Sequence, residues 1–298
     1  MRITIGLACV AFLAACSDKS TPSAPAPVPP MVVAPVAASA PPPKPTTEDK
    51  VNELLMKAVF GSQYRGDSLD ALATLTDYED RSKRAQFVVR AVANTVLATG
   101  ETVLVAEAND AEADGTARTS HATGGFLNVF LMRQIEGKWQ ILKRHENITM
   151  LGSDGSLGEV TWTQLATNKP GLAVINGGVW QGYSISNLAL FDLSADVMQD
   201  LAPGGIAMHS GSNGACDPEE TTECWEVNGK WRMQSARLGG FYDDVVVDFM
   251  GEKSTLAPRG EGQAPVPRVY TPVKGTARYA YDGKQYRLVE GENVVPEV

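Results

Sequence analysis

Four side chains outside the cysteines have the chemistry of a ligand or substrate site: Trp180, His209, Asp243 and Asp244. Trp180 lies in the glycine-rich run GGVWQGY at residues 177–183, whose flat rings and amide suit contacts with a sugar or a peptide. A tryptophan that fills a β core explains the same run. We therefore treat the four residues as candidate ligand or metal contacts and assign none of them a catalytic role.

Asp243 and Asp244 are the one adjacent pair among these candidates. Two carboxylates that flank a scissile glycosidic bond must face the same space, whereas neighbours on a strand point to opposite faces of the sheet. The sequence that follows, Val245-Val246-Val247, is typical of a strand. A turn that leads into a strand is accordingly the favoured interpretation of this pair.

The histidines and serines form no recognisable catalytic or metal motif. His121, His145 and His209 are far apart in the sequence, and none belongs to an H-E-x-x-H arrangement. The run HSGSNG that begins at His209 suggests a nucleophile loop, but Ser212 lacks the G-x-S-x-G elbow that exposes a catalytic serine. We expect no cofactor and no metal site, and a non-enzymatic role is favoured.

The charge of the chain limits its partners. With 26 basic and 35 acidic residues in 298, the formal net charge is −9 and the estimated pI is about 4.9. Binding to nucleic acid requires clustered basic residues that displace counterions from phosphates. A general DNA or RNA partner is therefore excluded.

The N-terminal segment has the pattern of an export signal. Arg2 is followed by an apolar run over residues 3–12, which is too short to cross a bilayer, and then by Leu13-Ala14-Ala15-Cys16. These last four residues resemble the lipobox of bacterial lipoproteins, and the resemblance implies cleavage after residue 15 and lipidation of Cys16. Attached acyl chains, palmitate among them, would then hold the protein on a membrane. Ser17 favours the outer membrane, facing the periplasm, and leaves surface exposure open.

The next segment, residues 16–46, reads as a disordered tether. Residues 17–46 contain ten prolines and six alanines and no aromatic side chain, so they cannot bury enough apolar surface to fold. The composition predicts three parts: a signal peptide at 1–15, the lipidated cysteine and tether at 16–46, and a single β-rich domain at 47–298. A Pro-rich ligand for another domain is the alternative for the tether.

Two cysteines remain in the predicted domain, Cys216 and Cys224. An exported chain enters an oxidising compartment, and a pair separated by seven residues can close a loop, so we predict a disulfide. Residues 217–223 between them carry four carboxylates. Their spacing does not match an EF-hand, and a solvated acidic loop is favoured over a cation site.

These candidates must be positioned mainly by strands. Apolar spacing predicts a helix from Thr47 to about Gly61, capped by Thr47, and a second, shorter helix over residues 67–75. Period-two patterning predicts strands beyond residue 85, at 102–108, 157–163, 171–175, 183–193 and 245–250 among others. Gly-Lys turns predict three hairpins at 134–139, 226–231 and 280–285.

The pattern as a whole indicates a mainly β fold with a short N-terminal helical segment, built as a multi-hairpin antiparallel sheet that is either propeller-like or a sandwich. We expect a membrane-anchored envelope lipoprotein whose domain binds another envelope protein or a cell-wall polymer. A hydrolase that acts on cell-wall or other envelope polymers is the alternative.

Overall fold

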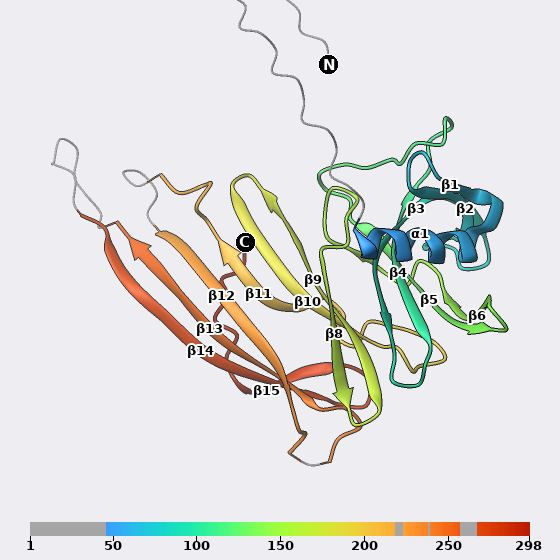
Figure 1. Ribbon diagram of the computed structural model, residues 1–298. Coiled ribbons are helices and arrows are strands. Elements are labelled where there is room, and N and C mark those ends of the chain that lie inside the picture. The colour runs from blue at the N-terminus through green and yellow to red at the C-terminus, as the bar shows by residue number, and fades with distance from the viewer. Residues whose placement is uncertain (1–45, 218–222, 238, 257–266) are drawn as a thin grey trace, which may run out of the picture. The chain divides into compact units, whose positions relative to one another are not determined.

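The computed structural model describes residues 46–217, 223–237, 239–256 and 267–298. Cys16 and the predicted signal and tether lie outside the described residues. Contacts group residues 45–298 into one compact unit. Its described residues are mainly β, with one short helix at the start and two antiparallel sheets, as the sequence predicted (Figure 1).

The N-terminal helix, α1 (Thr47–Phe60), has its N-cap one residue earlier than predicted. Thr46 is the N-cap: its hydroxyl accepts from the backbone N–H of Asp49 at 3.1 Å, and the Asp49 carboxylate accepts from the N–H of Thr46 at 2.7 Å. Gly61, at φ 55°, ends the helix as predicted. Within the described ranges no helix is long and apolar enough to cross a bilayer.

The first six strands of the first sheet follow the chain, each beside the next one in sequence. Its strands are β1 (Tyr64–Arg65), β2 (Asp70–Thr76), β3 (Arg84–Val96), β4 (Thr102–Asp110), β5 (Gly125–Ile135), β6 (Lys138–His145) and β7 (Met150–Leu151), which pairs with β5. The second helix predicted over 67–75 is wrong. Ala71, Ala73 and Leu75 are buried at alternate positions of β2, so a period of two, not of 3.6, describes this segment.

The second sheet is a longer meander that curls into a half-barrel. Its strands are β8 (Glu159–Ala166), β9 (Lys169–Trp180), β10 (Tyr183–Asp192), β11 (Ile206–Gly211), β12 (Glu223–Gln234), β13 (Asp244–Thr255), β14 (Val269–Tyr281) and β15 (Tyr286–Gly291). Each strand pairs antiparallel with the next along the chain. In Figure 1 these strands run from yellow-green β8 to red β15.

Two of the three predicted hairpins are confirmed. β5 and β6 turn at Glu136 and Gly137, both with positive φ, and β14 and β15 turn at Asp282 and Gly283. The hairpin predicted at 226–231 is wrong, because β12 runs straight through it. A Cβ on Gly229 would lie 2.8 Å from Val247 Cγ1, so this glycine makes room for a core side chain instead of a turn.

Three apolar clusters hold the elements together. One lies between α1 and the first sheet, and one lines the inner face of the half-barrel. The third joins the two sheets, as in the predicted sandwich alternative; it includes Val103, Val105, Leu127 and Val129 from the first sheet and Leu172, Val174, Ala189 and Phe191 from the second. Successive side chains of β9 point to opposite faces of the sheet. Leu172 and Val174 therefore pack in the cluster between the two sheets, and Ala173 packs in the cluster on the inner face of the half-barrel.

Candidate functional site

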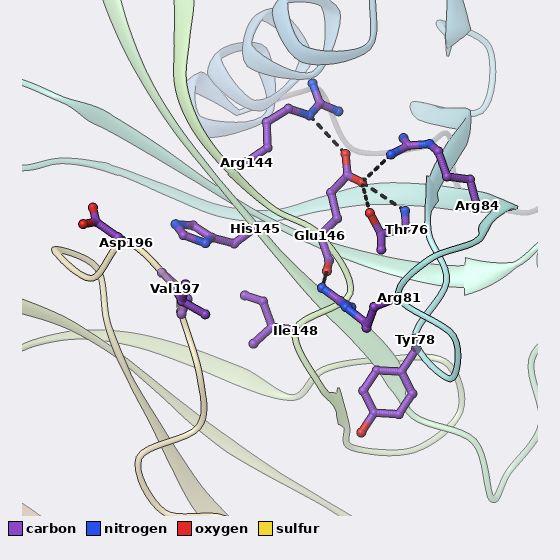
Figure 2. A pocket seen from close by; sticks show the side chains of 11 residues that line it. Thr76, Tyr78, Arg81, Arg84, Arg144, His145, Glu146, Ile148, Asp196 and Val197 are labelled. Atoms are coloured by element: carbon purple, nitrogen blue, oxygen red, sulfur yellow. Dashed lines mark hydrogen bonds and ion pairs between the residues drawn. The ribbon is translucent and has the colours of Figure 1, made fainter. Parts of the chain in front are cut away.

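A cavity of about 690 Å³ lies where three connecting segments meet. The β2–β3 loop contributes Arg81, the end of β6 and the residues after it contribute Arg144 to Ile148, and the β10–β11 loop closes the third side. We call it the arginine pocket, defined by Arg81, Arg84 and Arg144 (Figure 2). Its other lining residues are Thr76, Tyr78, His145, Glu146, Ile148, Asp196, Val197 and Met198.

Glu146 organises the polar side of this pocket. The residue is only 8% exposed, and its Oε2 accepts hydrogen bonds from the backbone N–H and the hydroxyl of Thr76, each at 3.0 Å. Arg144 Nε donates to the other oxygen at 3.1 Å, and Arg84 Nη1 lies 3.4 Å from Oε2 (Figure 2). Burial opposes the charge, but these hydrogen bonds outweigh it and hold the pKa of Glu146 below its usual value.

The three guanidinium groups are held by other contacts as well. Arg81 donates to the carbonyl oxygens of Asn147 at 2.8 Å and of Glu146 at 3.0 Å, and Arg84 donates to the carbonyl oxygen of Thr74. The guanidinium of Arg144 lies 5.0 Å from the centre of the Phe130 ring. Side chains that are already ordered lose less entropy when they bind a ligand.

Formal charge makes the arginine pocket attractive to anions. Three arginines and one buried carboxylate, that of Glu146, line this part of the pocket, which leaves an excess of two positive charges. Asp196, on the opposite wall, is paired with Lys143 at 2.8 Å, and Lys143 lies outside the lining. In a chain whose net charge is −9, this is a local reversal of sign.

His145 supplies a polar group that the fold leaves open. Its Nε2 is buried and has no hydrogen-bond partner among the described residues. Burial lowers the pKa of His145, the nearby charge of Lys143 lowers it further, and Asp196 opposes both. The ring is therefore neutral near pH 7, and a neutral imidazole can donate or accept a hydrogen bond.

The arginine pocket also has an apolar side. Ile148, Val197 and Met198 line it, and Val197 is 80% exposed. Tyr78 stands at the edge with its ring 5.3 Å from that of Phe126. The site can therefore hold an anionic group against the guanidiniums while it covers a short carbon skeleton.

The residues singled out in the sequence are not gathered in one place. Asp244 pairs with Gln234 on β12. The hairpin that carries Trp180 is level with Glu226 on the same strand, through the pairs of β9, β10 and β11. Glu226 and Gln234 are eight residues apart along β12 (234 − 226). At about 3.3 Å per residue this is roughly 26 Å. The aspartates and Trp180 thus lie at opposite ends of the half-barrel.

The two aspartates have different surroundings. Asp244 is buried in an ion pair with Arg278 at 2.6 Å. The backbone of Asp243 is tied down, because its carbonyl oxygen accepts from the Tyr286 hydroxyl at 2.8 Å. Asp244 also lines a second cavity of about 460 Å³, together with Tyr242, Tyr281 and Arg278.

Trp180 and His209 lie on β9 and β11. The ring of Trp180 is 6.4 Å from that of His121. His209 bonds to Ser184 and Asn228 on the neighbouring strands. Within the described ranges, no group of three or more histidine, cysteine, aspartate or glutamate side chains is close enough to hold a metal ion.

The predicted disulfide between Cys216 and Cys224 is confirmed, with Cα atoms 5.7 Å apart. It ties the segment after β11 to the start of β12. Residues 218–222 of this loop, which include Glu219 and Glu220, lie outside the described residues, so the interpretation of that loop stays a prediction.

No sequence pattern predicts the arginine pocket. Arg81 and Arg144 are separated by 63 positions (144 − 81), and no motif links them. The nearest signal is the run Arg144-His145-Glu146, which puts three ionisable residues together at a strand end. Comparison with protein-family models, with curated proteins and with solved structures finds no match, so function has to be argued from the site itself.

Proposed function

We propose that this protein is a binding protein of the bacterial cell envelope whose arginine pocket takes an anionic ligand, and that a lipid on Cys16 anchors it to the membrane. The observation that carries the binding proposal is the presence of three guanidinium groups in the lining of one pocket, where only two of them pair with the buried carboxylate of Glu146. The anchor is supported by the lipobox pattern that ends at Cys16.

The ligand class follows from the chemistry of the walls. Guanidinium is planar and binds carboxylate or phosphate oxygens in pairs, which favours these groups over simple halides. A cavity of about 690 Å³ has the size of a small-molecule site. The acidic surface of the whole chain disfavours long polyanions. The proposal is therefore a small carboxylate or phosphate, free or as a group on a cell-wall polymer or a protein of the envelope.

The hydrolase alternative built on Asp243 and Asp244 has less support. Arg278 neutralises Asp244 in a pair whose side chains are almost fully buried, and the backbone of Asp243 is engaged by Tyr286. A general acid and base must reach the substrate. The binding role therefore remains the favoured function.

Thermal unfolding of the full chain tests the proposed ligand class. Inorganic phosphate and succinate, each at matched ionic strength against sodium chloride, should raise Tm, because a ligand that binds only the folded state stabilises it. The arginine pocket predicts that Arg84→Gln abolishes most of this rise. Arg232→Gln removes an exposed arginine of the other sheet and should keep it. Equal Tm values in all three salts would reject the proposal.

A further inference from the structure

A serine, a histidine and an asparagine form a hydrogen-bonded chain across three neighbouring strands of the second sheet. Ser184 lies on β10, His209 on β11 and Asn228 on β12. Ser184 Oγ is 2.8 Å from His209 Nε2, and His209 Nδ1 is 3.0 Å from Asn228 Oδ1. None of these three residues lines the arginine pocket.

The strand register places all three on the outer face of the half-barrel. His209 pairs directly with Asn228, and Ser184 pairs with Gly211, two residues further along β11. Val227 and Met208, their neighbours in sequence, are buried in the inner cluster. Because adjacent residues on a strand face opposite ways, His209 and Asn228 face outward, and the register shift between Ser186 and Asn187 brings Ser184 to their side of the sheet.

The amide of Asn228 fixes which nitrogen of His209 carries the proton. Asn228 Nδ2 donates to Glu226 Oε1 at 3.4 Å, so Oδ1 is the atom turned toward the ring. An amide oxygen can only accept, and His209 Nδ1 must therefore be the donor. In the tautomer with its proton on Nδ1, Nε2 is the nitrogen that accepts the hydroxyl proton of Ser184. This is the arrangement that a general base for a serine nucleophile requires.

The carboxylate of Glu226 lies near the ring of His209, where a positive charge forms when the ring takes that proton. Glu226 Oε1 lies 3.5 Å from His209 Nδ1. Its other oxygen accepts from Asn213 Nδ2 at 2.9 Å, which holds the carboxylate in place. A nearby negative charge stabilises an imidazolium.

Gly211 leaves room for the side chains of Ser184 and Glu226 to approach each other. It is the residue paired with both Ser184 and Glu226, and it lies between them. A Cβ at this position would be 2.3 Å from Glu226 Oε2 and 2.9 Å from Ser184 Oγ. Any other residue would push these groups apart, so only glycine permits the arrangement.

We propose that Ser184 is a nucleophile for acyl transfer from small carboxylic esters, with His209 as its general base and Asn228 as a positioning residue. Ser184 Oγ bonds to the ester carbonyl carbon while its proton passes to His209 Nε2. The carbon–oxygen bond to the alcohol then breaks, and the alcohol leaves with that proton. Water, deprotonated by the same nitrogen, releases the carboxylic acid and restores the serine.

The test is covalent labelling of the full chain with a fluorophosphonate, which bonds to an activated serine and releases fluoride. Peptide mass spectrometry should find the adduct on Ser184. Ser184→Ala should abolish it, and His209→Asn should slow it about a hundredfold, the scale of general-base catalysis. Ser186→Ala is the matched control, since Ser186 lies on the same strand and pairs with His209, and it should label at the normal rate.

The role of Asn228 is tested by rescue. Asn228→Ala should lose labelling, whereas Asn228→Asp should keep it, because a carboxylate also accepts from Nδ1. Circular dichroism and Tm of each variant show whether it is folded, and hydrolysis of p-nitrophenyl acetate should follow the labelling rates. A folded wild-type chain that does not label, or Ser184→Ala labelled at the wild-type rate, would overturn the proposal and leave the arginine pocket untouched.

Discussion

The carboxylate of Glu146 accepts both the backbone N–H and the hydroxyl of Thr76, each at 3.0 Å. This pair ties the residue after β6 to the last residue of β2, two strands that are not neighbours in the first sheet. The same carboxylate contacts Arg84 and Arg144. One buried charge thus closes the loops around the arginine pocket and aligns two of its three cations.

Replacing Glu146 should destabilise the fold. In Glu146→Ala the Thr76 N–H loses its partner and the two arginines lose their counter-charge, at a cost of about 3 kcal/mol in the free energy of unfolding. Glu146→Gln keeps an acceptor and should cost less. Glu252→Gln, on an exposed part of β13, is the control and should stay within about 0.5 kcal/mol of wild type. Urea unfolding measures all three, and an unchanged midpoint for Glu146→Ala would contradict the role assigned to it.

The same residue should make stability depend on acid pH. The folded pKa of Glu146 is below its ordinary 4.5, because hydrogen bonds from Thr76 and Arg144 outweigh the effect of burial. Its contribution is therefore fully present above pH 4.5 and is lost as pH falls through the folded pKa. The wild-type chain should lose more stability between pH 5 and about pH 3 than Glu146→Gln does. If the wild-type chain and Glu146→Gln lose the same stability over this range, other carboxylates control the acid transition.

His121 should titrate above its ordinary pKa of 6.5. The Asp154 carboxylate, 3.1 Å from Nδ1, is the main cause, and the carbonyl oxygen of Val179 adds to it. The raised pKa means that the contact stabilises the fold fully below pH 6.5 and fades as pH rises through the folded value. An NMR titration of the His121 ring should show a lower pKa in Asp154→Asn. Equal values in the two proteins would remove Asp154 as the cause.

Lipidation of Cys16 is the sharpest prediction from the N-terminus. Cells that express the full chain with radiolabelled palmitate should incorporate the label, and Cys16→Ser should abolish it. Cys9→Ser, in the apolar run, should leave incorporation unchanged. Label that persists in Cys16→Ser would contradict the anchor and would not affect the arginine pocket.

Local patterns predicted part of this fold, and tertiary packing decided the rest. Asp282-Gly283 turns a hairpin, whereas Asn228-Gly229, with equal turn chemistry, runs through the middle of β12 because Val247 and Phe249 fill the space above Gly229. Leucines spaced by three at 69, 72 and 75 fit a helix, yet burial in β2 follows alternation. In these two segments the local spacing fits either outcome, and packing against neighbouring strands decides between them.

The sites were harder to predict than the strands. His209 was singled out from its sequence neighbours Ser210 and Ser212, but its hydroxyl partner is Ser184, which strand register brings to it from β10. Arg81 and Arg144 line the same pocket only after the strands of the first sheet have paired. Contacts between residues so far apart depend on pairing register, which no local spacing encodes.

Isothermal titration of the full chain with inorganic phosphate tests whether the arginine pocket binds an anion. We expect one site per chain, with affinity reduced about tenfold or more by Arg84→Gln, since a charge-assisted hydrogen bond contributes about 1.5 to 3 kcal/mol. Arg232→Gln should bind like wild type. Binding that is absent from the wild-type chain, or equal in the Arg84 and Arg232 variants, would contradict an anion site in the arginine pocket.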